Sequence, residues 1–144
     1  MSDRFLAVLA LTAVAGAIIY MMRDKIPVPN VSPERPFIAS NDHRVVPSID
    51  NSPTFEVLSR PGAAGPQYFC AAAEYARQVL RAEMTDILVS TTAEGPSRTN
   101  PDFRSVMFEL RAPEEAPSSG SGITIDISEP RQVRSVAVAL QFCR

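Results

Sequence analysis

Two cysteines are the residues of this sequence whose chemistry depends most on the compartment of the protein. Cys70 and Cys143 lie 73 positions apart, and neither belongs to a CxxC or CxxCH motif, so thioredoxin-like chemistry and covalent haem attachment have no support. In an exported small domain an even number of cysteines is typical of a disulfide, and closing so long a loop is worth about 4 kcal/mol in the chain-entropy model. The alternative is a pair of buried free thiols.

Other chemistry-bearing residues form no recognisable array. His43 is the only histidine and has no second type of metal ligand patterned around it, so we expect a solvated side chain in a linker. Glu114 and Glu115 are adjacent in a polar loop, which indicates a solvated acidic turn rather than paired catalytic carboxylates. No Ser/His/Asp or Cys/His arrangement and no phosphate-binding loop is present. We therefore expect a non-enzymatic protein without a metal ion or other cofactor.

Charge limits the class of partner. The segment 54–144 carries nine arginines against eleven acidic residues, and the whole chain has a net charge of −2. Because phosphate binding needs a concentrated basic face, a nucleic-acid partner is not expected. Lys25 is the only lysine among fourteen basic residues. This preference for arginine suggests a GC-rich coding sequence and a bacterial origin.

The run from Phe5 to Met22 contains eighteen residues without a charge. As a helix it would reach about 27 Å, close to the roughly 30 Å hydrocarbon core of a bilayer, so we expect a transmembrane anchor over residues 1–25. The apolar positions taken to mark the span are Phe5, Leu9, Ile18, Ile19 and Met22. A secretory signal cleaved after Ala15 is the alternative.

Charge alone does not orient this helix, because basic and acidic residues nearly balance on its two sides. The short N-terminal head and the use of cysteine favour an outward-facing domain. We therefore expect a single-pass protein of a bacterial inner membrane, with the C-terminal domain in the periplasm and the lipid bilayer and another membrane or periplasmic protein as partners.

Residues 26–53 are rich in proline and are expected to form an extended linker. Phe37 and Ile38 form a short apolar island within it, as do Val45 and Val46. These islands are expected to dock either on the protein's own domain or on a neighbour, and Phe37 and Ile38 are candidate partner contacts.

A small α+β domain is expected over residues 54–144. Alternating apolar residues predict strands over 54–58, 86–92, 104–111, 123–128 and 134–142, and apolar residues at helical spacing predict a helix over 67–84. One helix would then cover one face of a mostly antiparallel sheet of about five strands. A disulfide would join the helix start to the last strand, although strict alternation directs Cys143 away from the face of Phe142.

Arg77 and Arg81 would lie four residues apart on this helix, where like charges repel. They indicate either an anionic partner or a solvated face. The resulting hypothesis is a membrane-anchored accessory protein that binds a partner. The rival hypothesis is an exported ligand-binding domain or enzyme with its site in the polar loops 93–102 and 112–122, because such loops often carry function on a rigid scaffold.

Overall fold

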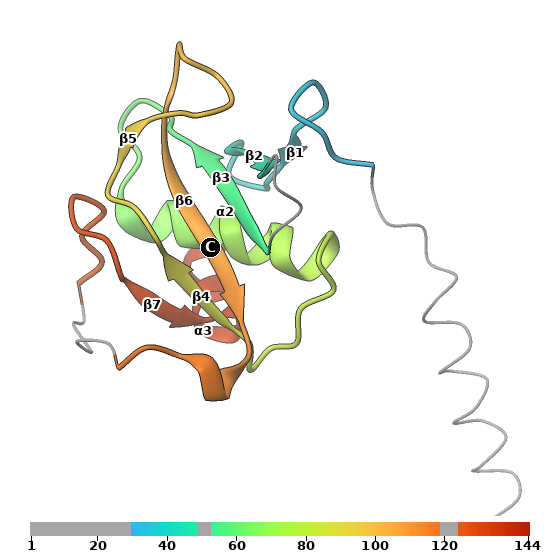
Figure 1. The fold of residues 1–144 in the computed structure, drawn as a ribbon, viewed down its shortest axis with the longest axis vertical. Coiled ribbons are helices and arrows are strands. Elements are labelled where there is room, and N and C mark those ends of the chain that lie inside the picture. The colour runs from blue at the N-terminus through green and yellow to red at the C-terminus, as the bar shows by residue number, and fades with distance from the viewer. Residues whose placement is uncertain (1–29, 49–52, 119–123) are drawn as a thin grey trace, which may run out of the picture.

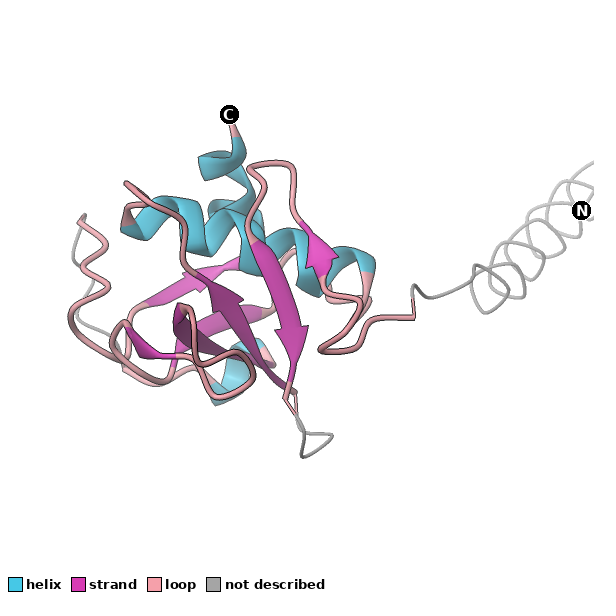
Figure 2. Cartoon of the chain, turned by 90° about the horizontal axis from the view of Figure 1, so that it is seen from above, coloured by secondary structure: helices cyan, strands magenta, loops and turns pink. Residues whose placement is uncertain are grey.

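The computed structural model describes residues 30–48, 53–118 and 124–144, and it shows two helices packed on one face of an antiparallel sheet (Figures 1 and 2). The expected α+β class is therefore confirmed. The expected span from Phe5 to Met22 lies outside the described residues. Within the described ranges, no helix combines the length and the apolar character needed to cross a membrane.

The sheet has the strand order β1-β2-β3-β6-β4-β7, with β5 paired to the start of β6, and every pair is antiparallel. The seven strands of the described residues are β1 (Phe37–Ile38), β2 (Arg44–Pro47), β3 (Thr54–Leu58), β4 (Ile87–Ser90), β5 (Gly95–Pro96), β6 (Arg104–Arg111) and β7 (Val133–Ser135). The predicted strands 54–58 and 104–111 match β3 and β6, and 86–92 contains β4. Side chains alternate along β6, so Val106 and Phe108 enter the core below the helices while Ser105 and Met107 occupy the opposite face.

The expected linker 26–53 contributes two strands to this sheet. Val45 pairs with Val57, and both Val45 and Val46 are buried. The ring of Phe37 lies edge-on to the ring of Tyr75, 5.8 Å between centroids. The expectation of an extended linker is thus wrong for residues 37–47, because two apolar islands suffice to form strands once β3 offers a hydrogen-bonding edge.

Helix α2 (Gly65–Gln78) begins two residues before the predicted start at residue 67. Pro66 occupies the first turn, and the Gln67 side chain accepts a hydrogen bond from the Ala64 N–H at 2.6 Å. The predicted end at residue 84 is wrong, because Arg81 adopts a φ of 61° and turns the chain. Arg77 and Arg81 therefore do not form the expected pair on one helix.

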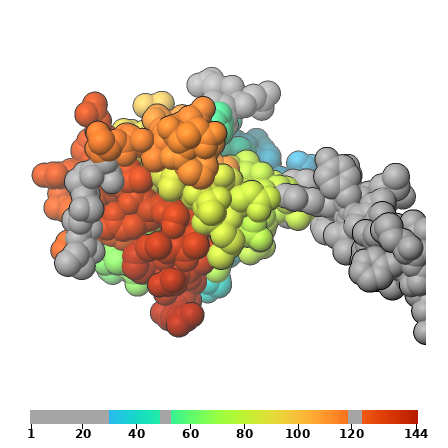
Figure 3. Space-filling model, turned by 90° about the horizontal axis from the view of Figure 1, so that it is seen from below, coloured from blue at the N-terminus to red at the C-terminus, as the bar shows by residue number. Residues whose placement is uncertain are grey.

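The chain ends in a helix where a strand was expected over 134–142. After β7, α3 (Val136–Leu140) and the 3-10 turn η2 (Gln141–Cys143) follow. The Ser135 hydroxyl caps α3 by accepting from the Val138 N–H at 3.3 Å, and Val136 and Ala139 are buried in the core beside α2. Figure 3 shows the red C-terminal segment lying against the yellow-green segment of α2. The helical turn removes the alternation that would have directed Cys143 away from the core.

The expected strand 123–128 is also absent from its described part, 124–128. Asp126 accepts hydrogen bonds from the Ser128 N–H at 2.8 Å and the Ser128 hydroxyl at 2.6 Å, which closes a turn. Ile125 is buried and packs against Gly65 at the start of α2. Local side-chain bonding of aspartate therefore prevails over the alternating pattern. The short 3-10 turn η1 (Pro113–Glu115) follows β6.

Candidate functional site

The most unusual group of the described chain is the carboxylate of Glu56, in the middle of β3. Phe55 and Val57 point into the core below α2, so Glu56 points to the opposite face of the sheet. Its exposed fraction is 1%. An ionised group at that depth is costly unless polar partners replace its water.

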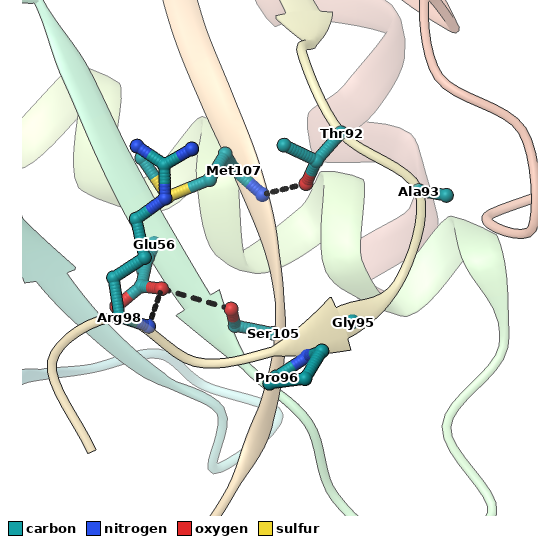
Figure 4. A pocket seen from close by; sticks show the side chains of 8 residues that line it. All are labelled: Glu56, Thr92, Ala93, Gly95, Pro96, Arg98, Ser105 and Met107. Atoms are coloured by element: carbon teal, nitrogen blue, oxygen red, sulfur yellow. Dashed lines mark hydrogen bonds between the residues drawn. The ribbon is translucent and has the colours of Figure 1, made fainter. Parts of the chain in front are cut away.

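Five donors surround this carboxylate, and Figure 4 shows two of them, the Arg98 N–H and the Ser105 hydroxyl. The five donors are the hydroxyls of Ser97 (3.1 Å), Thr99 (2.5 Å) and Ser105 (3.0 Å) and the backbone N–H groups of Arg98 (2.6 Å) and Thr99 (3.2 Å). Four of the five come from the loop between β5 and β6. Glu56 therefore ties this loop to the sheet.

The donors also determine the ionisation of Glu56. Burial by itself raises the pKa of this carboxyl, but the hydrogen bonds from Thr99, Arg98, Ser105 and Ser97 outweigh burial and hold the pKa below its ordinary value. A carboxylate has about four lone-pair positions, so five donors leave none of them free for a substrate. The arrangement suits a fixed structural anion better than a group that exchanges protons with a substrate.

A hollow of about 200 Å³ opens beside Glu56, and Figure 4 shows its side chains. Its lining comes from Glu56, Thr92, Ala93, Gly95, Pro96, Arg98, Ser105 and Met107. The Thr92 hydroxyl is engaged by the Met107 N–H at 3.1 Å. Of the two loops in the rival hypothesis, 93–102 contributes to this hollow, whereas the described residues of 112–122 do not.

The expected disulfide is present in the structure. Cys70 of α2 and Cys143 are bonded, with 5.1 Å between their Cα atoms. The Glu74 carboxylate lies within 4.8 Å of both sulfurs, and it accepts hydrogen bonds from the Ser40 N–H at 2.7 Å and from the Ser40 hydroxyl. Since the sulfurs are bonded to each other, this group of three residues does not offer two thiolates to a metal ion.

His43 is buried, which corrects the expectation of a solvated side chain. Its exposed fraction is 2%, and its ring lies edge-on to the ring of Tyr68 at 5.1 Å. Within the described residues, neither ring nitrogen has a hydrogen-bond partner. Burial lowers the pKa of the imidazole, so His43 is neutral near pH 7.

Tyr68, whose ring contacts His43, also contacts the ion pair between Glu94 and Arg104. Its hydroxyl donates to the Glu94 carboxylate at 2.5 Å, and Arg104 contacts the other oxygen of Glu94 at 3.3 Å. Burial and the neighbouring carboxylate raise the pKa of the Tyr68 hydroxyl, so the phenol keeps its proton.

The four candidate partner contacts occupy different environments. Phe37 is half-buried against Tyr75, whereas Ile38 has an exposed fraction of 53% on the edge strand β1. The Arg77 guanidinium donates to the Ala82 carbonyl beyond the end of α2. A role of these residues in partner binding stays a prediction.

Comparison with protein-family models, curated proteins and solved structures yields no match. The function therefore has to be inferred from the geometry of the chain itself. One feature of the sequence points to Glu56: it is a carboxylate inside a largely apolar strand, Thr-Phe-Glu-Val-Leu. The hydroxyl residues that surround it lie 41 to 49 positions downstream, and only the pairing of β3 with β6 brings them close.

Proposed function

We propose that this protein is a non-enzymatic accessory protein, anchored in a bacterial inner membrane by residues 1–25, whose small periplasmic domain binds another membrane or periplasmic protein. The observation that carries the proposal is the bond between Cys70 and Cys143. Disulfides persist in oxidising compartments and are rare in the bacterial cytoplasm. Together with the apolar run from Phe5 to Met22, the bond favours a domain exported on a retained membrane anchor.

The ionisable groups support a binding role over catalysis. The Glu56 carboxylate is saturated by five donors, and the Tyr68 hydroxyl is committed to Glu94. The buried His43 packs against an aromatic ring. Hydroxyls do contact carboxylates in this domain, but the hydrogen bonds lower the pKa of Glu56 in spite of burial, and burial raises the pKa of Tyr68. Glu56 is therefore a weak base and Tyr68 a weak nucleophile.

Ile38 offers the most direct test of partner binding, because it is the most exposed large apolar residue of the described chain. The full-length protein with a photo-crosslinking residue at position 38 is expected to give one discrete crosslinked species in membranes. The same residue at Glu114, an exposed position of η1, is the control. The substitution Ile38→Asp is expected to reduce recovery of the partner after gentle detergent extraction.

Folding of the Ile38→Asp variant is checked by retention of the disulfide. Migration of the wild-type protein alone, in crosslinked membranes and in gentle extracts, would contradict the accessory role. Equal crosslinking from positions 38 and 114 would contradict a contact at β1.

A further inference from the structure

A second hollow, called here the arginine hollow, lies where β3 ends and beside the turn that joins β1 to β2. Its volume is about 350 Å³. The residues that line it are Asp42, Arg44, Leu58, Ser59, Arg60, Pro61 and Phe103. This volume is at the lower end of the range for small-molecule sites, about 300 to 1,000 Å³.

Arg44 is the first charged group of this hollow. Its guanidinium carbon lies 5.9 Å from the centroid of the Phe103 ring, a distance at which the cation and the ring attract each other. No carboxylate of the described residues lies within 4.0 Å of this guanidinium. The aromatic ring thus orients Arg44, and the N–H groups of its guanidinium donate to no carboxylate of the described residues.

Phe103 is well placed to hold that orientation. Its N–H donates to the Asn100 carbonyl at 3.0 Å, and its carbonyl accepts from the Ser97 N–H at 2.9 Å. Ser97 in turn donates to Glu56. Because Glu56 holds the loop between β5 and β6, this loop fixes the backbone of Phe103, which forms one wall of the arginine hollow.

Arg60 is the second charged group. Its Nη1 donates to the Asn41 carbonyl at 2.7 Å and to the Asp42 carboxylate at 3.3 Å. Both contacts use the same nitrogen, and no described residue accepts from Nη2 or Nε. The side chains of Arg60 and Asp42 are 48% and 74% exposed, so their ion pair is weak and open to exchange with a stronger acceptor.

The hollow therefore combines two guanidinium groups with one carboxylate, in a protein whose net charge is negative. Guanidinium groups bind carboxylates through two parallel hydrogen bonds. Leu58, Pro61 and Phe103 supply apolar surface in the same hollow. A ligand that matches both properties carries a single carboxylate on a compact apolar body.

We propose that the arginine hollow binds a small organic acid of this kind. Its carboxylate pairs with Arg44 and Arg60, and its apolar body lies against Phe103 and the neighbouring walls. The ligand carboxylate competes with Asp42 for Arg60 and supplies Arg44 with an anionic partner. The site does not depend on the accessory role proposed above.

Calorimetric titration of the full-length protein in detergent, with its disulfide intact, tests this site. The probes are benzoate, which is a carboxylate on a single apolar ring, benzamide, which has the same shape without the charge, and inorganic phosphate. Benzoate is expected to bind saturably, and benzamide and phosphate at least about tenfold more weakly. Arg44→Gln is expected to weaken benzoate binding at least about tenfold.

Arg131→Gln is the matched control, because it removes the same charge from an exposed turn that lines neither hollow. It is expected to leave benzoate affinity within about twofold. Arg44→Lys keeps the charge without the planar fork and is expected to fall between wild type and Arg44→Gln. Absence of saturable benzoate binding, equal affinity in the wild type and Arg44→Gln, or equal binding of benzamide or phosphate would each overturn the proposal.

Discussion

The ring of His43 lies edge-on to the ring of Tyr68, 5.1 Å between centroids, and both residues are buried. Tyr68 finds a partner for its hydroxyl in Glu94, whereas both nitrogens of His43 lack one within the described chain. This edge-on contact places a titratable group at the junction of β2 and α2, where its protonation affects the stability of the whole domain.

His43 predicts a loss of stability in weak acid. Burial is the largest influence and lowers the folded-state pKa of His43; Asn41 opposes it, the charge of Arg60 adds to the lowering, and Asp42 has the smallest, opposing effect. Between this lowered pKa and the unfolded value of about 6.5, the unfolded chain binds more protons. The contribution of His43 to the free energy of unfolding is therefore complete above about pH 6.5 and declines as the pH falls, by at most about 1.4 kcal/mol per pH unit.

Urea unfolding of the oxidised protein between pH 5 and pH 7.5 measures this slope. His43→Phe, which keeps an aromatic ring against Tyr68, is expected to flatten it. Glu56 has little effect on the slope over most of this range, because its folded-state pKa is lowered and its contribution declines as the pH falls toward and below the ordinary value of 4.5. An unchanged slope in His43→Phe would assign the acid sensitivity to another group.

Glu56→Gln is expected to destabilise the domain by about 2 kcal/mol. The amide nitrogen of glutamine would face donors from the loop, so buried N–H and O–H groups would lose their acceptor. Glu109→Gln is the control, because Glu109 pairs with Arg111 at 2.7 Å at a partly exposed site, and its loss is expected to cost less than about 1 kcal/mol. Denaturant unfolding checks both variants, and equal effects would show that Glu56 is not the anchor of the loop.

Gly65→Ala is expected to destabilise the domain by about 1 to 3 kcal/mol through overpacking, even though alanine is the better helix former. A Cβ atom at position 65 would lie 2.4 Å from the Ile125 carbonyl oxygen. At Gly95 the nearest heavy atom would be the Ala93 carbonyl oxygen at 3.9 Å, so Gly95→Ala is expected to change stability by less than about 0.5 kcal/mol. Thermal unfolding of the two variants tests the contact, and a stabilised Gly65→Ala protein would contradict it.

Replacement of both cysteines, Cys70→Ala with Cys143→Ala, is expected to lower the free energy of unfolding by about 2 to 5 kcal/mol. The bond closes a loop of 73 positions and joins α2 to the end of the chain, where fraying is otherwise expected. Treatment of the wild-type protein with a reductant should reproduce most of this loss. Maleimide labelling of native membranes is expected to require prior reduction. Free thiols that label without reduction would contradict both the bond and the periplasmic location.

Several elements follow from local sequence alone. Strands β3 and β6 match their predicted bounds, because alternation of apolar and polar residues directs one face of each to the core. The start of α2 follows from the position of Pro66. The pairing of Cys70 with Cys143 follows from their being the only two cysteines.

Other elements depend on contacts between distant segments. Alternation predicts a strand through Val136, Val138 and Leu140. Packing of Val136 and Ala139, three residues apart, beside α2 selects a helix instead. The helical turns that follow also bring Cys143 to Cys70. Strand β2 exists because β3 offers it a paired edge. The donors of Glu56 gather only when β3 pairs with β6. The sequence by itself therefore determined which residues form the apolar face of each element. Where the same apolar residues fitted both the alternation of a strand and the spacing of a helix, tertiary packing decided between the two.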